Sequence, residues 1–161
     1  MNKIILLIIL FCTVNGYSQK KTVVIDSVIF NLPGENWKLK DSYNQSGQYM
    51  YENKKAKIAV TLSARGKTQY EFYKDSQNDY ELVNTFYKWD ADYWRTSTNC
   101  EIKEIKKDSL QKFIIWTIKV PNGENYCLYG LKSNHLIRIN LDKKSFIETD
   151  AIKFLEQTFI N

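Results

Sequence analysis

Residues 112–141 read KFIIWTIKV-PNG-ENYCLYGLK-SNH-LIRINL, and this stretch decides the fold. Runs rich in β-branched and aromatic residues alternate with the turn sequences Pro121-Asn122-Gly123 and Ser133-Asn134, a pattern typical of strands joined by hairpins. Such short links force neighbouring strands to run antiparallel. With a further run before Lys107-Asp108-Ser109, the predicted strands are 101–106, 112–120, 125–132 and 136–141.

Apolar side chains fall on both faces of this predicted meander. Turns at Asp108-Ser109 and Asn122 fix a register that sorts the side chains into two sets. One face carries Ile114, Trp116, Ile118, Leu128, Ile137 and Ile139; the other carries Phe113, Ile115, Tyr129, Leu131 and Leu136. A sheet with one solvent-exposed face would show a stricter alternation of apolar and polar residues along each strand. We therefore predict an α+β fold with helices on both faces of an antiparallel sheet, that is, an α/β/α sandwich.

The predicted helices begin at capping-box pairs. Asn78 and Glu81 open a helix that ends near Thr96. Its apolar residues recur at helical spacing, with Asp90, Asp92 and Arg95 placed on the other side. The remaining pairs predict a short helix from Thr68 with Glu71, and a C-terminal helix from Ser145 with Glu148 through Phe159.

The N-terminal part of the domain reads as strands and turns. Residues 23–31 form a β-branched, apolar strand candidate, and Leu32-Pro33-Gly34-Glu35-Asn36 has the composition of a turn that Trp37 follows. Residues 48–52 and 58–64 predict a hairpin. The order of elements and the segment FNLPGENW (residues 30–37) resemble the Mog1/PsbP-like fold group across nearly all of residues 19–161. This resemblance implies a small non-catalytic protein that binds or stabilises a larger partner, and it transfers no catalytic residue.

Residues 1–18 resemble a secretory signal peptide. Lys3 precedes an apolar run over residues 4–11, which is shorter than the roughly 20 residues that span a bilayer. Gly16 and Ser18 supply small side chains before a cut at Gln19. We therefore expect a periplasmic or secreted protein, with residues 19–161 as one domain and no transmembrane segment after processing. An uncleaved anchor, a buried first strand and a lipoprotein signal at Cys12 remain alternatives.

Cys100 and Cys127 are the two cysteines of this domain. Export would place them in an oxidising compartment where a disulfide can form. In the predicted register, however, Cys100 and Cys127 lie on the two strands that flank the strand of Thr117, each opposite Thr117. Their Cα atoms are therefore two strand spacings, or roughly 9–10 Å, apart. A disulfide requires less than about 7 Å. We predict two free thiols.

The sequence argues against most enzymatic chemistry. His135 is the only histidine and lies at a predicted hairpin turn, so a Ser–His–Asp or Cys–His mechanism lacks a placed base. One histidine and two strand cysteines do not make a zinc site. We therefore expect no catalytic residue, metal or cofactor. The net charge of +5 is spread along the chain, and an exported protein with no binding motif is a poor partner for nucleic acid.

One aromatic group, Trp89, Tyr93 and Trp94 together with Asp90, Asp92 and Arg95, is a candidate binding surface. Trp, Tyr and Arg are favoured as interface anchors, but their spacing also suits rings that cover the sheet. Exposure of Trp89 or Trp94 would favour binding. The leading hypothesis is a non-enzymatic protein of the cell envelope that binds a protein partner. The alternatives are an immunity protein that neutralises a delivered toxin and a carrier for a small apolar ligand.

Overall fold

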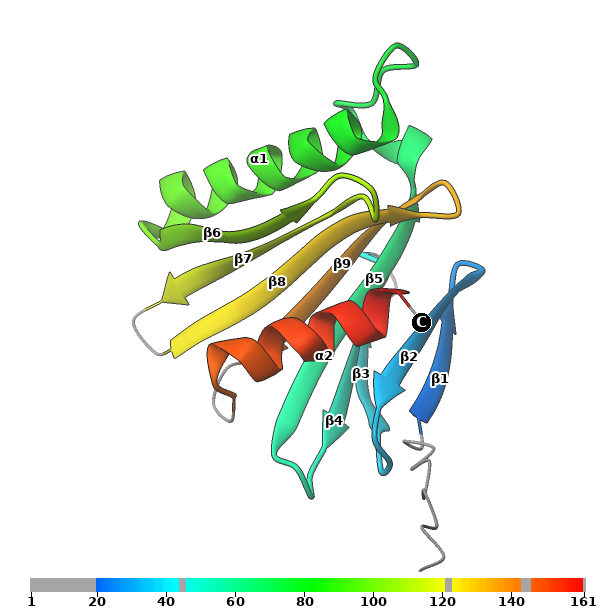
Figure 1. Ribbon diagram of the computed structural model, residues 1–161, viewed down its shortest axis with the longest axis vertical. Coiled ribbons are helices and arrows are strands. Elements are labelled where there is room, and N and C mark those ends of the chain that lie inside the picture. The colour runs from blue at the N-terminus through cyan, green and yellow to red at the C-terminus, as the bar shows by residue number, and fades with distance from the viewer. Residues whose placement is uncertain (1–19, 44–45, 121–122, 143–145, 161) are drawn as a thin grey trace, which may run out of the picture.

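The computed structural model describes residues 20–43, 46–120, 123–142 and 146–160. This part of the chain is α+β: a seven-stranded antiparallel sheet of order β3-β4-β5-β9-β8-β7-β6, a separate β1–β2 hairpin, and two helices on the sheet (Figure 1). The strands are β1 (Lys20–Ile25), β2 (Val28–Pro33), β3 (Lys38–Tyr43), β4 (Gln48–Asn53), β5 (Ile58–Gly66), β6 (Glu101–Asp108), β7 (Phe113–Val120), β8 (Gly123–Lys132) and β9 (His135–Asp142); the helices are α1 (Asp79–Thr98) and α2 (Glu148–Ile160).

The predicted antiparallel meander is confirmed by strands β6 to β9, and the predicted hairpin by β4 and β5. The single strand expected over residues 23–31 is wrong. The chain reverses at Asp26 and Ser27, which have φ of 47° and 67°, so that Val23 pairs with Phe30 in a two-stranded hairpin. Asp is one of the residues that tolerates this left-handed conformation. Strand β3, which is exposed along its length, was not predicted, because it has no apolar alternation.

The register across β7 and β8 also differs from the prediction. Val120 pairs with Gly123, so Trp116 lies opposite Cys127 where Thr117 was expected. A slip of one residue moves every side chain to the other face. Consequently Cys127 and Tyr129 share a face with Trp116, whereas Leu128 lies on the opposite face.

The register of β6 differs as well. Strand β6 runs on to Asp108 and contains an irregularity between Glu104 and Lys106, so Thr117 faces Lys103. Cys100 therefore precedes the strand and does not face Thr117 as predicted.

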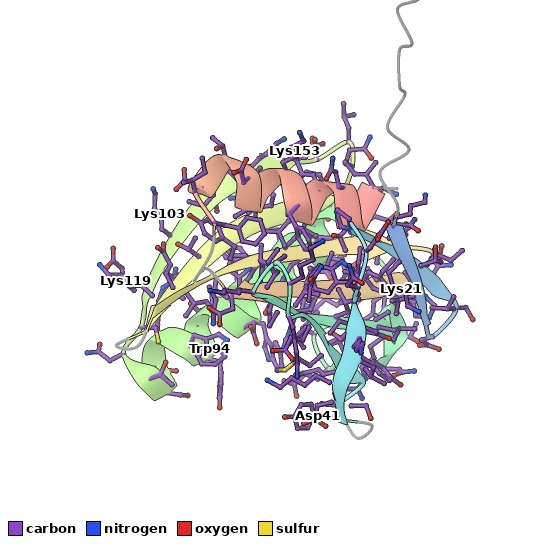
Figure 2. The ribbon with its side chains drawn as sticks, turned by 90° about the horizontal axis from the view of Figure 1, so that it is seen from below. Lys21, Asp41, Trp94, Lys103, Lys119 and Lys153 are labelled. Atoms are coloured by element: carbon purple, nitrogen blue, oxygen red, sulfur yellow. The ribbon has the colours of Figure 1, made fainter. Side chains whose placement is uncertain are left out.

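The two helices cover opposite faces of the sheet. Helix α1 packs on β6, β7 and β8 around Trp116 and Tyr129. Helix α2 packs with the β1–β2 hairpin on the other face, around Leu128 and Ile139. Figure 2 shows α2 above the sheet and α1 below it. Both faces of the central strands are thereby buried, as their apolar residues require.

The start of α1 agrees with its predicted capping box. The Asn78 side chain accepts a hydrogen bond of 2.9 Å from the Glu81 amide, and the Glu81 carboxylate accepts one of 3.1 Å from the Asn78 amide. The helix ends at Thr98, before Asn99 in the left-handed conformation. The short helix expected at Thr68 is instead a 3-10 turn, η1 (Lys67–Gln69), without a side-chain cap. The predicted cap of α2, Ser145, lies outside the described residues, as does the signal segment 1–18.

The turn after β2 anchors the hairpin to α2. The Trp37 indole donates a 2.8 Å hydrogen bond to the carbonyl of Pro33, and its ring packs against Phe154 with centroids 5.8 Å apart. Trp37 is thereby buried at the end of the hairpin. Among the described residues, no helix is both long and apolar enough to cross a membrane.

Gly130 allows α2 to approach β8 closely. A Cβ atom at this position would lie 2.6 Å from the Phe159 ring. We expect Gly130→Ala to destabilise the domain by about 1–3 kcal/mol, because overpacking displaces the ring and the helix end. Urea unfolding of residues 19–161 measures this loss. In a Phe159→Leu background, where part of the ring is gone, Gly130→Ala should destabilise the domain less. An unchanged urea midpoint for Gly130→Ala alone would contradict the close packing of Gly130 on Phe159.

Candidate functional site

The aromatic surface of α1 consists of Trp89 and Tyr93, which are 43% and 58% exposed. The sequence placed these rings in a group with Trp94 and Arg95, and the structure keeps all four on the same helix. Their roles differ, because Trp94 is half-buried and Arg95 is exposed. The residues that α1 buries in its core stripe are Leu82, Val83, Phe86, Tyr87, Asp90 and Ala91. The interpretation in which Trp89 and Tyr93 cover the sheet is therefore wrong.

Both exposed rings are supported by neighbours. The Trp89 indole donates a 3.2 Å hydrogen bond to Glu71, and its ring lies 5.5 Å from Phe72. Tyr93 meets Trp94 edge-to-face with centroids 5.9 Å apart. Such contacts restrict the rotamers of the two exposed side chains, so that less side-chain entropy is lost when they contact a partner.

Arg95 forms a 2.7 Å ion pair with Asp92, one turn earlier on α1. Both side chains are exposed, so this pair adds little to stability. It places polar groups of both signs beside the aromatic surface, as in the polar rim of an interface.

Asp90 corrects the prediction that placed it on the solvent side of α1, because it is only 5% exposed. Its carboxylate accepts hydrogen bonds from Tyr129 and from the Trp94 indole at 3.1 Å, and it pairs with Arg138 at 3.1 Å. Arg138 comes from β9, far away in the sequence. A buried carboxylate is tolerated when it is paired and hydrogen-bonded in this way.

Burial keeps the Tyr129 hydroxyl of this cluster protonated. Burial, together with the charge of Asp90, holds the pKa of Tyr129 well above its ordinary range, although the nearby Arg138 opposes the shift. The Tyr129 hydroxyl therefore stays neutral and donates its hydrogen bond. Arg138 also stacks over the Tyr129 and Phe86 rings, 5.1 and 5.5 Å from their centroids. The cluster joins α1 to β8 and β9, and its Asp90 carboxylate holds the Trp94 indole through a hydrogen bond.

Cys100 and Cys127 are both buried, free cysteines. Cys127 lies on the α1 face of β8, where burial raises the pKa of its thiol far above the ordinary value. Cys100 follows α1, and its sulfur lies 2.8 Å from the Thr98 hydroxyl. The raised pKa of Cys127 disfavours the thiolate form that a nucleophilic cysteine needs.

His135 is the first residue of β9, directly after the turn from β8. Its Nδ1 is 2.7 Å from the carbonyl of Ser133, and its Nε2 is 3.1 Å from the Asp26 carboxylate. These contacts link two hairpin turns and involve no nucleophile. Within the described residues, no group of three or more His, Cys, Asp or Glu side chains could hold a metal ion.

Trp94 also borders a cleft of about 370 Å³ on the α1 side of the sheet, which opens to solvent. Its lining is mixed, with Thr61 and Asn140 beside Met50 and Ala59, and it is open to solvent, unlike the closed apolar cavity that a carrier of an apolar ligand needs. The sequence did not single out these residues, because they come from strands that only the fold brings together.

No protein-family model matches this chain, and no curated protein matches its sequence. Its function must therefore be inferred from the geometry of its own residues.

We expect Asp90→Asn to destabilise the domain by about 3 kcal/mol, because it leaves Arg138 as an uncompensated buried charge. Asp92→Asn removes a carboxylate two residues away on the same helix and is the matched control. Because Asp92 is exposed, its variant should change the free energy of unfolding by less than about 0.5 kcal/mol. Chemical denaturation of both variants measures the difference; equal midpoints would mean that the buried pair has no structural role.

We expect the Cys127 thiol of the native domain to resist a thiolate-specific reagent at pH 8, and both cysteines to react once the domain is unfolded. The folded pKa of Cys127 is raised, so the stability contributed by its neutral thiol is present below the unfolded value of about 8.5 and is lost as pH rises above it. Colorimetric thiol titration of Cys100→Ser isolates Cys127. Rapid labelling of the folded variant would show that the thiol is accessible.

Proposed function

We propose that this chain is an exported, non-enzymatic protein of the cell envelope that binds a protein partner through the aromatic surface of α1. The observation that supports this function is the exposure of Trp89 and Tyr93 on one helix. Trp and Tyr are enriched among residues that dominate binding energy. Trp89 and Tyr93 are two amphipathic rings whose rotamers are restricted by contacts with Phe72 and Trp94. The polar Asp92–Arg95 pair lies beside them.

Export in this proposal depends on the signal sequence expected at residues 1–18. A Mog1/PsbP-like assignment of the α+β fold belongs to the same proposal, because that group consists largely of accessory proteins without catalysis. A specific form of the function is an immunity protein that neutralises a delivered toxin. A toxin gene immediately beside the gene for this chain would favour that form, and its absence would favour a general accessory role.

The proposal is tested with the tagged domain, residues 19–161, used to capture proteins from envelope extracts of the native cell. A stoichiometric partner should be retained by the wild-type domain and bound at least about tenfold more weakly by Trp89→Ala/Tyr93→Ala, since hot-spot truncations cost more than about 1–2 kcal/mol. Quantitative mass spectrometry and titration of the recovered partner measure the change.

Tyr43→Ala is the matched control, because Tyr43 is also half-exposed but lies on β3. It should bind the partner like the wild type. A folded Trp89→Ala/Tyr93→Ala variant that binds with undiminished affinity, or a wild-type domain that recovers no stoichiometric partner, would reject the proposed surface.

A further inference from the structure

The cleft beside the C-terminal half of α1 is the feature that the protein-binding function leaves unexplained. Helix α1 packs on β6, β7 and β8, and the cleft lies beside Trp94 of this helix, lined by residues of β7, β8, β9, β5, β4 and β3. In Figure 2, Trp94 of α1 and Asp41 of β3 both lie on the side of the sheet away from α2. A volume of about 370 Å³ falls within the range of roughly 300–1,000 Å³ typical of small-molecule sites.

The floor of the cleft contains an unsatisfied hydrogen-bond acceptor. The Oδ1 atom of Asn140 is buried and has no hydrogen-bond partner among the described residues. Asn140 lies on β9 between Thr61 of β5 and Cys127 of β8, and all three side chains line the cleft. The Asn140 side chain lines the cleft, so a ligand there can contact its amide group.

Charge at the cleft is balanced. The floor residues Asn140 and Thr61 are neutral, and burial raises the pKa of the Cys127 thiol so that it stays protonated. Lys40 and Asp142 line the cleft with opposite charges. Neither an anion nor a cation is therefore strongly favoured, and the lining suits a neutral polar ligand.

One wall of the cleft is an aromatic ring in a fixed position. The Trp94 indole is tied to the buried Asp90 carboxylate by its 3.1 Å hydrogen bond, and the Tyr93 ring meets it edge-to-face. Because Asp90 is itself held by Arg138 and Tyr129, the indole is anchored to the core of the α1–sheet interface. Such pre-organisation lowers the entropic cost of binding against this wall.

We propose that this cleft is a binding site for a neutral saccharide of one to two rings. A sugar hydroxyl both donates and accepts hydrogen bonds, as do the side-chain amides of Asn125 and Asn140 that line the cleft. The C–H face of a pyranose ring is an apolar surface that can pack on the Trp94 indole. An extended peptide fits less well, because β5, β9 and β8 are interior strands and offer no free edge for strand addition.

The test uses ¹⁵N-labelled residues 19–161 titrated with maltose, cellobiose and N,N′-diacetylchitobiose, with trialanine as the peptide probe. At least one disaccharide should shift the indole signal of Trp94 and the side-chain amide signals of Asn125 and Asn140 in a saturable manner. Asn140→Ala and the nearly isosteric Thr61→Val should each raise the dissociation constant about tenfold, as expected for a lost hydrogen bond. Asn84→Ala, on α1 but outside the cleft lining, should leave it unchanged.

The proposal is overturned if no disaccharide shifts these signals up to its solubility, or if trialanine shifts them and the sugars do not. It is also overturned if a folded Thr61→Val domain binds the sugar like the wild type. Trp89→Ala changes a residue of the aromatic surface that does not line the cleft, and it should keep the saccharide affinity. Failure of the protein-binding function and failure of the saccharide site are therefore distinguishable.

Discussion

The sheet is constrained by the burial of both faces of its central strands. Strands β7, β8 and β9 carry fully buried side chains in both directions, including Trp116 and Tyr129 on one face and Phe113 and Leu128 on the other. Burial of a large apolar side chain contributes roughly 1.5–3 kcal/mol relative to exposure. Each face therefore needs a cover, which α1 supplies on one side and α2 with the β1–β2 hairpin supplies on the other. The positions of both helices follow from this requirement.

The two covers differ in extent, and this difference leaves room for the cleft. On the α2 face, the hairpin extends the cover beyond the helix, and Trp37 packs against Phe154 between them. On the α1 face, a single helix packs on three strands near the β6 edge. The uncovered half of this face is mixed in chemistry, with the polar Thr61 and Asn140 beside Met50 and Ala59. The cleft thus arises from a sheet whose two halves have different chemistry on the same face.

The fold class could be predicted because its signals are local. Turn residues between apolar runs and the Asn78–Glu81 capping box are read within a few residues of sequence. The face of each strand could not be predicted as safely, since a one-residue difference at the β7–β8 turn moved Cys127 to the face of Trp116. The candidate site was predicted in part: Trp89 and Tyr93 were singled out, whereas Asn140 and Thr61 carry no local signal of a cleft.

Asp90 shows why helical spacing alone did not separate the exposed aromatic residues of α1 from its buried residues. Spacing places Asp90 on the buried stripe with Phe86 and Tyr87, but its charge favours solvent. Arg138, which β9 brings to 3.1 Å, decides in favour of burial. Trp94 then turns its indole nitrogen inward to Asp90, while Trp89 lies outside and bonds to Glu71. Through the carboxylate of Asp90, this long-range ion pair is linked to Trp94, which borders the cleft, whereas Trp89 lies exposed on α1.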